Sequence, residues 1–373
     1  MIVPVIVNFG FRLNAGDGQI ELLISSGFEE LFGRETAESL LREFEERNPD
    51  MRISQAVAGE KNKEPDIFIF DDGEYNALAA AGTLVSLSPY LHTESGAEQS
   101  AIPIVSFMDL LFYNIELLKA AGFDRPPKTR DEFIAYAKAV PSASGFPNDN
   151  QALYRDVFSW IWAAGGGFWS SSTPQFNNKA VTADISFLGR LNREARSFET
   201  TGAERLEEFA QGKTALMIAS TRDISALRKK MGDDTFGITT IPGSAGKYSV
   251  CLSGFYAGIS SACAYSDEAW RFLLFLAEQS PLIGAGLKAV PGGISDFPFR
   301  DYMKDDPFYS KAWDIFESSE IVQGFTGKAG GKEFEDIARE ELRIFFESSR
   351  SAEETTAAIQ RRWDAVPLPL DRE

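Results

Sequence analysis

The chain of 373 residues is long enough for two domains, each with a hydrophobic core of its own. Hydrophobic residues make up 44% and charged residues 25% of it, which is the balance of an ordinary globular protein and excludes a largely disordered chain. With 37 Lys and Arg residues against 55 Asp and Glu residues, the net charge is -18, which disfavours nucleic acid, anionic lipid and polyanionic substrates as partners.

Side chains for metal binding and nucleophilic catalysis are scarce. His92 is the one histidine and lies in a polar, turn-like stretch, so neither a Ser-His-Asp triad nor a histidine-rich zinc site is expected. The two cysteines, Cys251 and Cys263, form no CxxC motif and no disulfide framework. We therefore expect no metal ion and no cofactor.

No stretch has the unbroken apolar length of a membrane-spanning helix. Residues 1–9 are apolar, but they lack the basic segment and the small-residue cleavage site of a secretory signal, so they do not predict an intact signal peptide. Export has to be inferred from other features.

The first part of the chain alternates between strand-like and helix-like segments. Residues 19–27 predict a buried strand. Apolar residues then recur at helical spacing from Ala37 to Phe44 and predict a helix with one apolar face, which Asn48 and Pro49 end.

Two further strands are expected at residues 51–57 and 67–70, and a helix is expected to begin near Tyr75. This alternation of strands and helices favours an α/β fold with largely parallel sheets.

Three later helices carry start signals. Thr129 followed by Glu132 is the pattern of a capping box, and Ser351 followed by Glu354 repeats it. Ser266 is the expected N-cap of a third helix, which has acidic residues in its first turn.

This third helix is expected to bury one stripe of side chains and to end at Pro281. The stripe consists of Trp270, Leu273, Leu274 and Ala277.

Two glycine-rich stretches do not match nucleotide-binding motifs. In residues 324–334 the pair Gly331-Lys332 is followed by Glu333 rather than by Ser or Thr, so no P-loop is predicted. Residues 163–169 follow a helix rather than a strand, unlike a dinucleotide fingerprint.

Polar and aromatic side chains gather where the predicted strands end, which is where ligands of open α/β sheets bind. They are Ser25, Ser26 and Phe28 after the first strand, Asp71, Asp72, Glu74 and Tyr75 after the third, Ser220, Thr221 and Arg222 after residues 215–219, and Gly254, Phe255 and Tyr256 within residues 251–260. Ionised carboxylates only accept hydrogen bonds and therefore suit a ligand rich in hydroxyl donors. Aromatic faces suit the apolar side of a sugar ring, so the pattern predicts a carbohydrate site.

Several of these residues have a structural alternative. Asp71 or Asp72 can equally cap the helix that follows them. Trp160 and Trp162 can belong to the core, and because they are two positions apart on a helix, at most one of them is expected to be fully buried. The sequence pattern alone leaves both alternatives open.

The order of the segments resembles that of extracellular solute-binding proteins of the maltose-binding type (family 1), the capture subunits of bacterial ABC sugar importers. The resemblance covers most of residues 20–281 and is most specific in LLFYNIELLKAAGFDRPPKTRDEF. Other matching pieces are PDIFIFDDGEYNALAAAGTLVSLSPYL, FSWIWAAGGGFW, FAQGKTALMIAS and IPGSAGKYSVCLSGFYAGISS. The C-terminal part resembles the family in its helical character only.

The resemblance implies an α/β, two-lobed periplasmic-binding-protein-like fold (type II), with a ligand cleft between the lobes. The N-terminal lobe would comprise residues 1–108 and 262–312, and the C-terminal lobe residues 109–261 and 313–373. The lobes would close on the ligand by hinge motion.

The resemblance also implies ligand contacts, to which the strand-end pattern adds Tyr75. The full set of candidates is Ser26, Phe28, Asp71, Asp72, Tyr75, Phe107, Asp109, Trp160, Trp162, Ser220, Gly254, Phe255 and Tyr256. One departure concerns an arginine that family members often carry near residues 289–295, where Val290, Pro291 and Gly292 offer none.

A member of this family is not an enzyme. It would bind a mono- or oligosaccharide in the periplasm or elsewhere outside the cytoplasm, either free or as a lipid-anchored lipoprotein. Ligand binding would shift it toward a closed form, which delivers the sugar to the membrane permease of an ABC transporter. We expect a monomer with no nucleic-acid partner.

Three other functions stay open on the sequence alone. A polyamine or another cationic solute would also suit acidic and aromatic side chains. A glycoside hydrolase would need a second carboxylate opposite Asp72, and no second acid stands out. A sensor could keep the fold and pass its ligand to a receptor instead of a permease.

Overall fold

The computed structural model describes the chain from residue 19 to residue 366 with several gaps. The described residues are 19–56, 64–91, 99–140, 150–170, 173–195, 202–243, 248–287, 290–291, 305–325, 328 and 330–366. His92 and Gly292, which the sequence analysis singled out, lie outside them.

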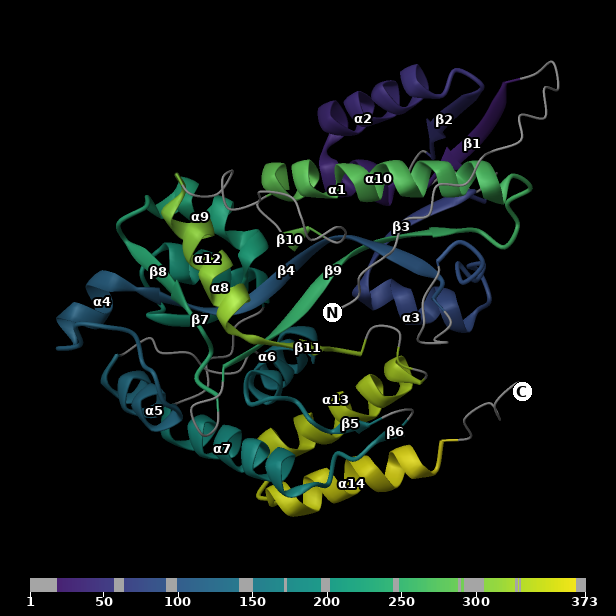
Figure 1. The fold of residues 1–373 in the computed structure, drawn as a ribbon. Helices are drawn as coiled ribbons and strands as arrows, with labels where there is room; N and C mark the ends of the chain where they lie inside the picture. The colour runs from purple at the N-terminus through teal and green to yellow at the C-terminus, as the bar shows by residue number, and fades with distance from the viewer. Residues whose placement is uncertain are drawn as a thin grey trace. The chain divides into compact units, whose positions relative to one another are not determined.

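The chain divides into two compact units, whose helices and strands are labelled in Figure 1. Unit 1 comprises Met1–Phe107 and Ser253–Tyr302, and unit 2 comprises Met108–Leu252 and Met303–Glu373. Two of the divisions fall inside the long strands β4 (Ala101–Asn114) and β9 (Ser249–Ile259), so each strand contributes to both units. The lobe boundaries given by the sequence stay a prediction.

Unit 1 contains strands in the order β10-β4-β9-β3-β1-β2. The shorter strands are β1 (Ile20–Ile24), β2 (Met51–Gln55), β3 (Ile67–Asp71) and β10 (Val290–Pro291). β1 pairs in parallel with β2 and β3, whereas the pairs β3–β9 and β4–β10 are antiparallel. The expectation of largely parallel sheets is therefore wrong, because β9 comes from a distant part of the chain and runs against β3.

The helices α1 (Gly27–Phe32), α2 (Arg34–Arg47) and α10 (Ser266–Leu287) pack on the core of unit 1 (Figure 1). The predicted apolar face of α2 is confirmed, since Ala37, Leu40, Leu41 and Phe44 are all buried. The Phe44 ring meets Phe272 of α10 edge to face at 5.0 Å between centroids, and Phe28 of α1 lies 6.0 Å from the same ring. Aromatic packing thus joins all three helices.

Helix α10 differs from its prediction in two respects. Its fully buried residues are Ala269, Phe272, Leu273 and Leu276. Trp270 is also buried, but Leu274 and Ala277 are only partly buried, so the buried stripe is rotated toward Phe272. The helix also continues through Pro281 to Leu287, because a proline removes one backbone donor without forcing the helix to end.

In unit 2 the later part of β4 pairs antiparallel with β7 (Leu216–Ser220) and with β8 (Phe236–Thr239). The beginning of β9 pairs in parallel with β11 (Glu320–Gln323). The short strands β5 (Trp169–Ser170) and β6 (Thr173–Pro174) pair antiparallel.

Helices make up most of unit 2. They are α4 (Ile115–Ala120), α5 (Arg130–Ala139), α6 (Asn150–Ala163), α7 (Lys179–Ala195), α8 (Gly202–Ala210), the 3-10 turn η1 (Thr221–Asp223), α9 (Ile224–Met231), α12 (Pro307–Ser318), α13 (Gly331–Glu347) and α14 (Ala352–Asp364). Rings from separate helices and loops form the core: Phe158 lies 5.0 Å from Phe325, and Phe168 lies 5.1 Å from Phe176.

Both predicted capping patterns begin helices, but only one is reciprocal. Ser351 and Glu354 exchange both hydrogen bonds at the start of α14. Thr129 accepts from the Glu132 N–H at the start of α5, whereas the Glu132 carboxylate accepts from Lys128 N and pairs with Arg125. The hydrogen bond from Arg125 lowers the pKa of Glu132 to about 2.

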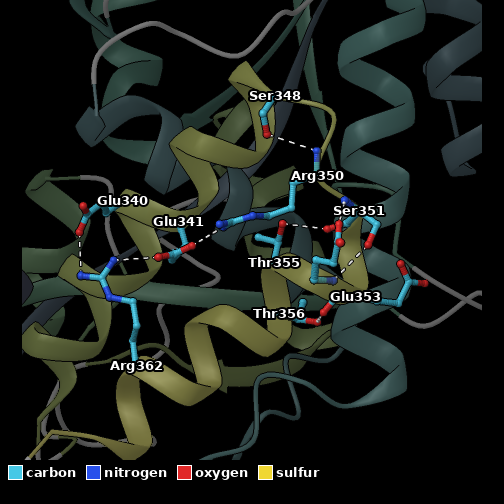
Figure 2. Close-up of polar contacts among 10 residues, drawn as sticks. Glu340, Glu341, Ser348, Arg350, Ser351, Glu353, Thr355, Thr356 and Arg362 are labelled. Carbon is cyan, nitrogen blue, oxygen red and sulfur yellow. Dashed lines mark hydrogen bonds and ion pairs between the residues drawn. The ribbon is translucent and has the colours of Figure 1, made fainter.

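A charged network joins α13 to α14 (Figure 2). The Glu341 carboxylate on α13 accepts from Arg350, which precedes α14, and from Arg362 at 2.9 Å near its end. Burial alone would raise the pKa of Glu341, but the hydrogen bonds from Arg362 and Arg350 more than offset this and lower it. Arg362 also pairs with Glu340 at 2.7 Å.

We expect Glu341→Gln to lower the free energy of unfolding by about 2 kcal/mol at pH 7, because it leaves two arginines without their shared partner. The matched change Glu340→Gln should cost less than about 0.5 kcal/mol, because an exposed ion pair contributes little. Glu341 is 8% exposed in its side chain and Glu340 is 53% exposed. Urea denaturation of the two variants measures both values.

The pH dependence gives a second check. The pKa of Glu341 is lower in the folded chain, so its stabilisation is present above the unfolded pKa and is lost as the pH falls through the folded value. The difference between wild type and Glu341→Gln should therefore shrink on acidification. Equal costs for the two variants, or a difference that grows at low pH, would contradict this role.

Candidate functional site

The strand β3 passes directly into helix α3 (Asp72–Ala80), and Asp71 caps this helix. Its Oδ1 accepts hydrogen bonds from Gly73 N at 2.9 Å and Glu74 N at 3.2 Å. The capping alternative is therefore confirmed for Asp71. The helix begins three residues earlier than expected, because the cap lies at the last residue of the strand.

The next residue, Asp72, connects α3 to β9 within unit 1. Its Oδ2 accepts from the Gly254 backbone N–H at 2.5 Å, and its Oδ1 accepts from the Tyr256 hydroxyl at 3.1 Å. The two neighbouring aspartates thus have different roles: Asp71 holds the helix, and Asp72 holds the strand beside it.

Three rings pack around this connection, and we call Phe70, Tyr75 and Tyr256 the tyrosine cluster. Tyr75 meets Tyr256 edge to face at 5.3 Å between centroids, and Phe70 lies nearly parallel to Tyr256 at 6.2 Å. Tyr75 is 8% exposed, and burial raises the pKa of its hydroxyl. The cluster fixes the orientation of the Tyr256 ring and so of the hydroxyl that meets Asp72.

Gly254 is required by the close approach of β9 to β4. A Cβ atom at this position would lie 2.5 Å from the Val105 carbonyl oxygen and 3.2 Å from the Ser106 hydroxyl. Any side chain would push the two strands apart and displace the N–H that Asp72 accepts.

Acidic groups lie beside the Asp71 cap. Burial raises the pKa of Glu74, and the negative charges of Asp71 and Glu30 raise it further. At the end of β1, the predicted Ser26 lies at the start of α1, where its hydroxyl reaches Glu30 at 3.5 Å.

Ser25, which the sequence prediction did not include among the ligand contacts, has a defined role in joining β1 to β3. Its Oγ accepts from Ile69 N at 2.8 Å. The adjacent Gly27 lies so close that a Cβ atom would be 2.2 Å from the Ile69 carbonyl oxygen. In the sequence, the pattern Ser-Ser-Gly after a strand is the feature that could have indicated this connection between β1 and β3.

Two of the predicted residues of unit 2 lie in the β4–β7 pair, and a third lies at the aromatic core. Asp109 is opposite Ser220 in the register, and its Oδ2 accepts from the Ser159 hydroxyl of α6 at 2.9 Å. Ser220 caps the 3-10 turn that follows β7. Trp162 is partly exposed and packs against Phe158 and Phe325 of the aromatic core.

Ser159 was not among the residues predicted from the sequence. A hydroxyl between the apolar residues of VFSWIWA was its only signal.

Three of the predicted contacts lie in the cores. Phe28 is fully buried, Phe107 is 4% exposed and Trp160 is 2% exposed. Packing covers these rings; Trp160, for example, meets Phe133 edge to face at 4.8 Å. Their contacts with a ligand stay a prediction. The expectation that at most one of Trp160 and Trp162 is fully buried is confirmed.

The remaining candidates form two sets, one in each unit. Unit 1 contributes Ser26, Asp71, Asp72, Tyr75, Gly254, Phe255 and Tyr256, and unit 2 contributes Asp109, Trp162 and Ser220. Within the described ranges no group of three or more His, Cys, Asp or Glu residues could hold a metal ion. The same part of the chain has no helix that is long and apolar enough to cross a membrane.

We expect Tyr256→Phe to lower the free energy of unfolding by about 1 kcal/mol, because it removes the hydroxyl that donates to Asp72 and keeps the ring packing. The matched control is Tyr248→Phe, at an exposed tyrosine, which should change stability by less than about 0.5 kcal/mol. Urea denaturation measures both. Equal effects of the two changes would show that the Asp72–Tyr256 hydrogen bond contributes nothing.

Comparisons with solved structures show the fold. The structure is similar to a cyclic alpha-maltosyl-1,6-maltose binding protein from Arthrobacter globiformis, with a TM-score of 0.76, 18% identity, and coverage of 93% of this chain and 99% of that one. It is also similar to UgpB from Mycobacterium tuberculosis in complex with glycerophosphocholine (TM-score 0.73, 20% identity, 94% and 98% coverage). Maltose-bound MalE3 of T. maritima gives a TM-score of 0.70 at 17% identity, with 92% and 99% coverage. The predicted periplasmic-binding-protein-like α/β fold is confirmed.

Curated relatives match over part of their length. A "Probable ABC transporter-binding protein" of Deinococcus radiodurans is 23% identical over 245 residues, which is 60% of this chain and 58% of that protein. A binding protein of Brucella abortus is 24% identical over 200 residues, 48% of this chain and 46% of its own length. The matched stretch thus spans about half of these relatives.

The family model described as bacterial extracellular solute-binding protein matches residues 44–280. This stretch holds α3, β9 and the Asp72 connection, as well as the strand ends of unit 2. On this match, the chain belongs to the bacterial extracellular solute-binding protein family.

Proposed function

We propose that this chain captures a mono- or oligosaccharide outside the cytoplasm and delivers it to an ABC importer. One observation carries the proposal: a carboxylate, Asp72, is fixed in orientation by two donors beside a cluster of tyrosine rings. A rigid acceptor next to aromatic surface is the chemistry that a polyhydroxylated ligand requires.

The hydrogen-bond directions within unit 1 favour a ligand that donates. The Tyr256 hydroxyl gives its proton to Asp72, so its oxygen is left to accept, and an ionised carboxylate also accepts. Asp71 and Glu74 add further negative charge next to this pair. An anionic ligand would be repelled there, whereas sugar hydroxyls would find acceptors.

The ligands of structurally similar proteins support a sugar. Those proteins include one named for cyclic alpha-maltosyl-1,6-maltose, one bound to maltose and one bound to mannotriose. Their fold is the one found in this chain, and in this chain the acceptors and rings lie at the ends of β3 and within β9.

The proposal extends to partner and location. A member of an extracellular solute-binding family would meet its ligand on the outer side of the cytoplasmic membrane, with the permease of an ABC transporter as its partner. We infer that the chain acts as a monomer, free or lipid-anchored, and that it binds without catalysis. Closure around the ligand by hinge motion belongs to the same proposal, and a fall in radius of gyration on ligand addition would test it by small-angle scattering.

Binding can be tested with two neighbouring aspartates as target and control. Isothermal titration calorimetry with glucose, maltose, maltotriose and mannotriose should give saturable binding of at least one sugar. Asp72→Ala should weaken that binding by about 10- to 100-fold, since it removes a charged acceptor. Asp71→Ala should change affinity much less while lowering stability by about 1 kcal/mol through loss of the helix cap.

Two outcomes would overturn the proposal. One is that no sugar of the panel binds at millimolar concentration while spermidine does, which would make the ligand a cation. The other is that Asp72→Ala leaves every sugar-binding event of the titration unchanged in affinity.

A further inference from the structure

Unit 2 has a hollow of about 790 Å³ between α7 and the first turns of α14, far in sequence from Asp72. The two helices run antiparallel: Thr182 meets Thr356 at 3.1 Å between hydroxyl oxygens, and one turn later on α14 Gln360 accepts from Phe176 N at 2.7 Å. The lining residues on α7 recur every three or four positions from Lys179 to Arg190, so the hollow follows the helix for about 16 Å.

The wall formed by α14 is held in place without any ligand. Figure 2 shows Glu353 and Thr356 in the same turns that Ser351 caps and that Arg350 ties to Glu341. A site whose walls are already ordered loses little conformational entropy on binding.

Four polar side chains line the hollow and have no hydrogen-bond or ion-pair partner among the described residues. They are Asn177, Lys179, Ser186 and the carboxylate of Glu353. Lys179 donates, Glu353 accepts, and the amide and the hydroxyl can do both. The hollow therefore offers both hydrogen-bond donors and acceptors, whereas the groups around Asp72 are mainly acceptors.

The charges around the hollow nearly cancel. Arg190 is paired with Asp131 and, at 3.6 Å, with Glu194. That leaves the Lys179 ammonium and the Glu353 carboxylate as one charge of each sign. Neither a strongly anionic nor a strongly cationic ligand gains from this arrangement.

Apolar surface is present between the polar groups. The Phe187 ring lines the hollow and is held by contacts with the Arg130 guanidinium at 4.7 Å and with Trp160 at 5.0 Å. The methyl groups of Ala183 and Ala357 lie beside it. A ring face with methyl groups suits the C–H side of a sugar.

We propose that this hollow is a second ligand site, which takes a neutral polyhydroxylated molecule of disaccharide or trisaccharide size. Mixed donors and acceptors, balanced charge, a fixed aromatic face and a length of about 16 Å specify that class together. The site lies within unit 2 alone and does not require the Asp72 connection to bind anything.

Side-chain footprinting tests the proposal on the full chain. Lys179 is acylated with a succinimidyl ester and Glu353 is labelled with a carbodiimide and an amine, each with and without maltose, maltotriose, glucose 6-phosphate or spermidine, and labelling is read by mass spectrometry. We expect maltose or maltotriose to reduce labelling of both residues several-fold and to leave the exposed Lys119 of α4 unchanged. The charged compounds should have little effect.

A filled hollow provides the control. Ala183→Trp should abolish the protection of Lys179 and Glu353, whereas Ala120→Trp, at an exposed alanine of α4, should not. Retained protection in Ala183→Trp, or no protection by either sugar, would overturn the second site. Calorimetry of Asp72→Ala in the Ala183→Trp background, where the hollow is filled, reports on the proposed main site alone, so failure of one site is distinguishable from failure of the other.

Discussion

The arrangement of the predicted site depends on how the Asp72 carboxylate connects α3 with β9. The two segments are 182 residues apart in sequence, and the carboxylate joins them through one backbone N–H and one tyrosine hydroxyl. The antiparallel β3–β9 pair brings Asp71 opposite Phe255, which puts Asp72 within reach of both donors. Gly254 is the other half of this constraint, since only a residue without a side chain lets β9 lie this close to β4.

Asp71 and Asp72 are neighbours in sequence but make different contacts. One carboxylate oxygen of Asp71 accepts hydrogen bonds from backbone N–H groups at the N-terminus of α3, as an N-cap residue does. Asp72 is the first residue of that helix, so its charge lies where the helix dipole favours an anion, and its orientation is set by β9. Phe70 and Tyr75 pack against the Tyr256 ring, and the result is an ordered patch of acceptors and rings.

Much of the local structure was predictable, because it depends on short-range chemistry. The apolar spacing from Ala37 to Phe44 gave α2, and Ser351 with Glu354 gave the start of α14. The polar residues after β3 also indicated a place where distant segments meet, since the Tyr256 hydroxyl donates to Asp72. Residue type and spacing within one element carry this information.

The predictions that were wrong concern features that depend on contacts between distant segments of the chain. The antiparallel course of β9 and the rotated buried face of α10 both follow from which elements pack together, and one sequence does not specify that. The hollow between α7 and α14 is of the same kind: its residues come from two helices about 170 positions apart and show no motif in either.

A crystal structure of the chain with a bound sugar would show whether Asp72 contacts the ligand. We expect a sugar hydroxyl within hydrogen-bond distance of the Asp72 carboxylate, which keeps its contacts with Gly254 N and the Tyr256 hydroxyl. A sugar bound to the protein with no contact to Asp72, or an Asp72 carboxylate turned away from β9 in the complex, would contradict it.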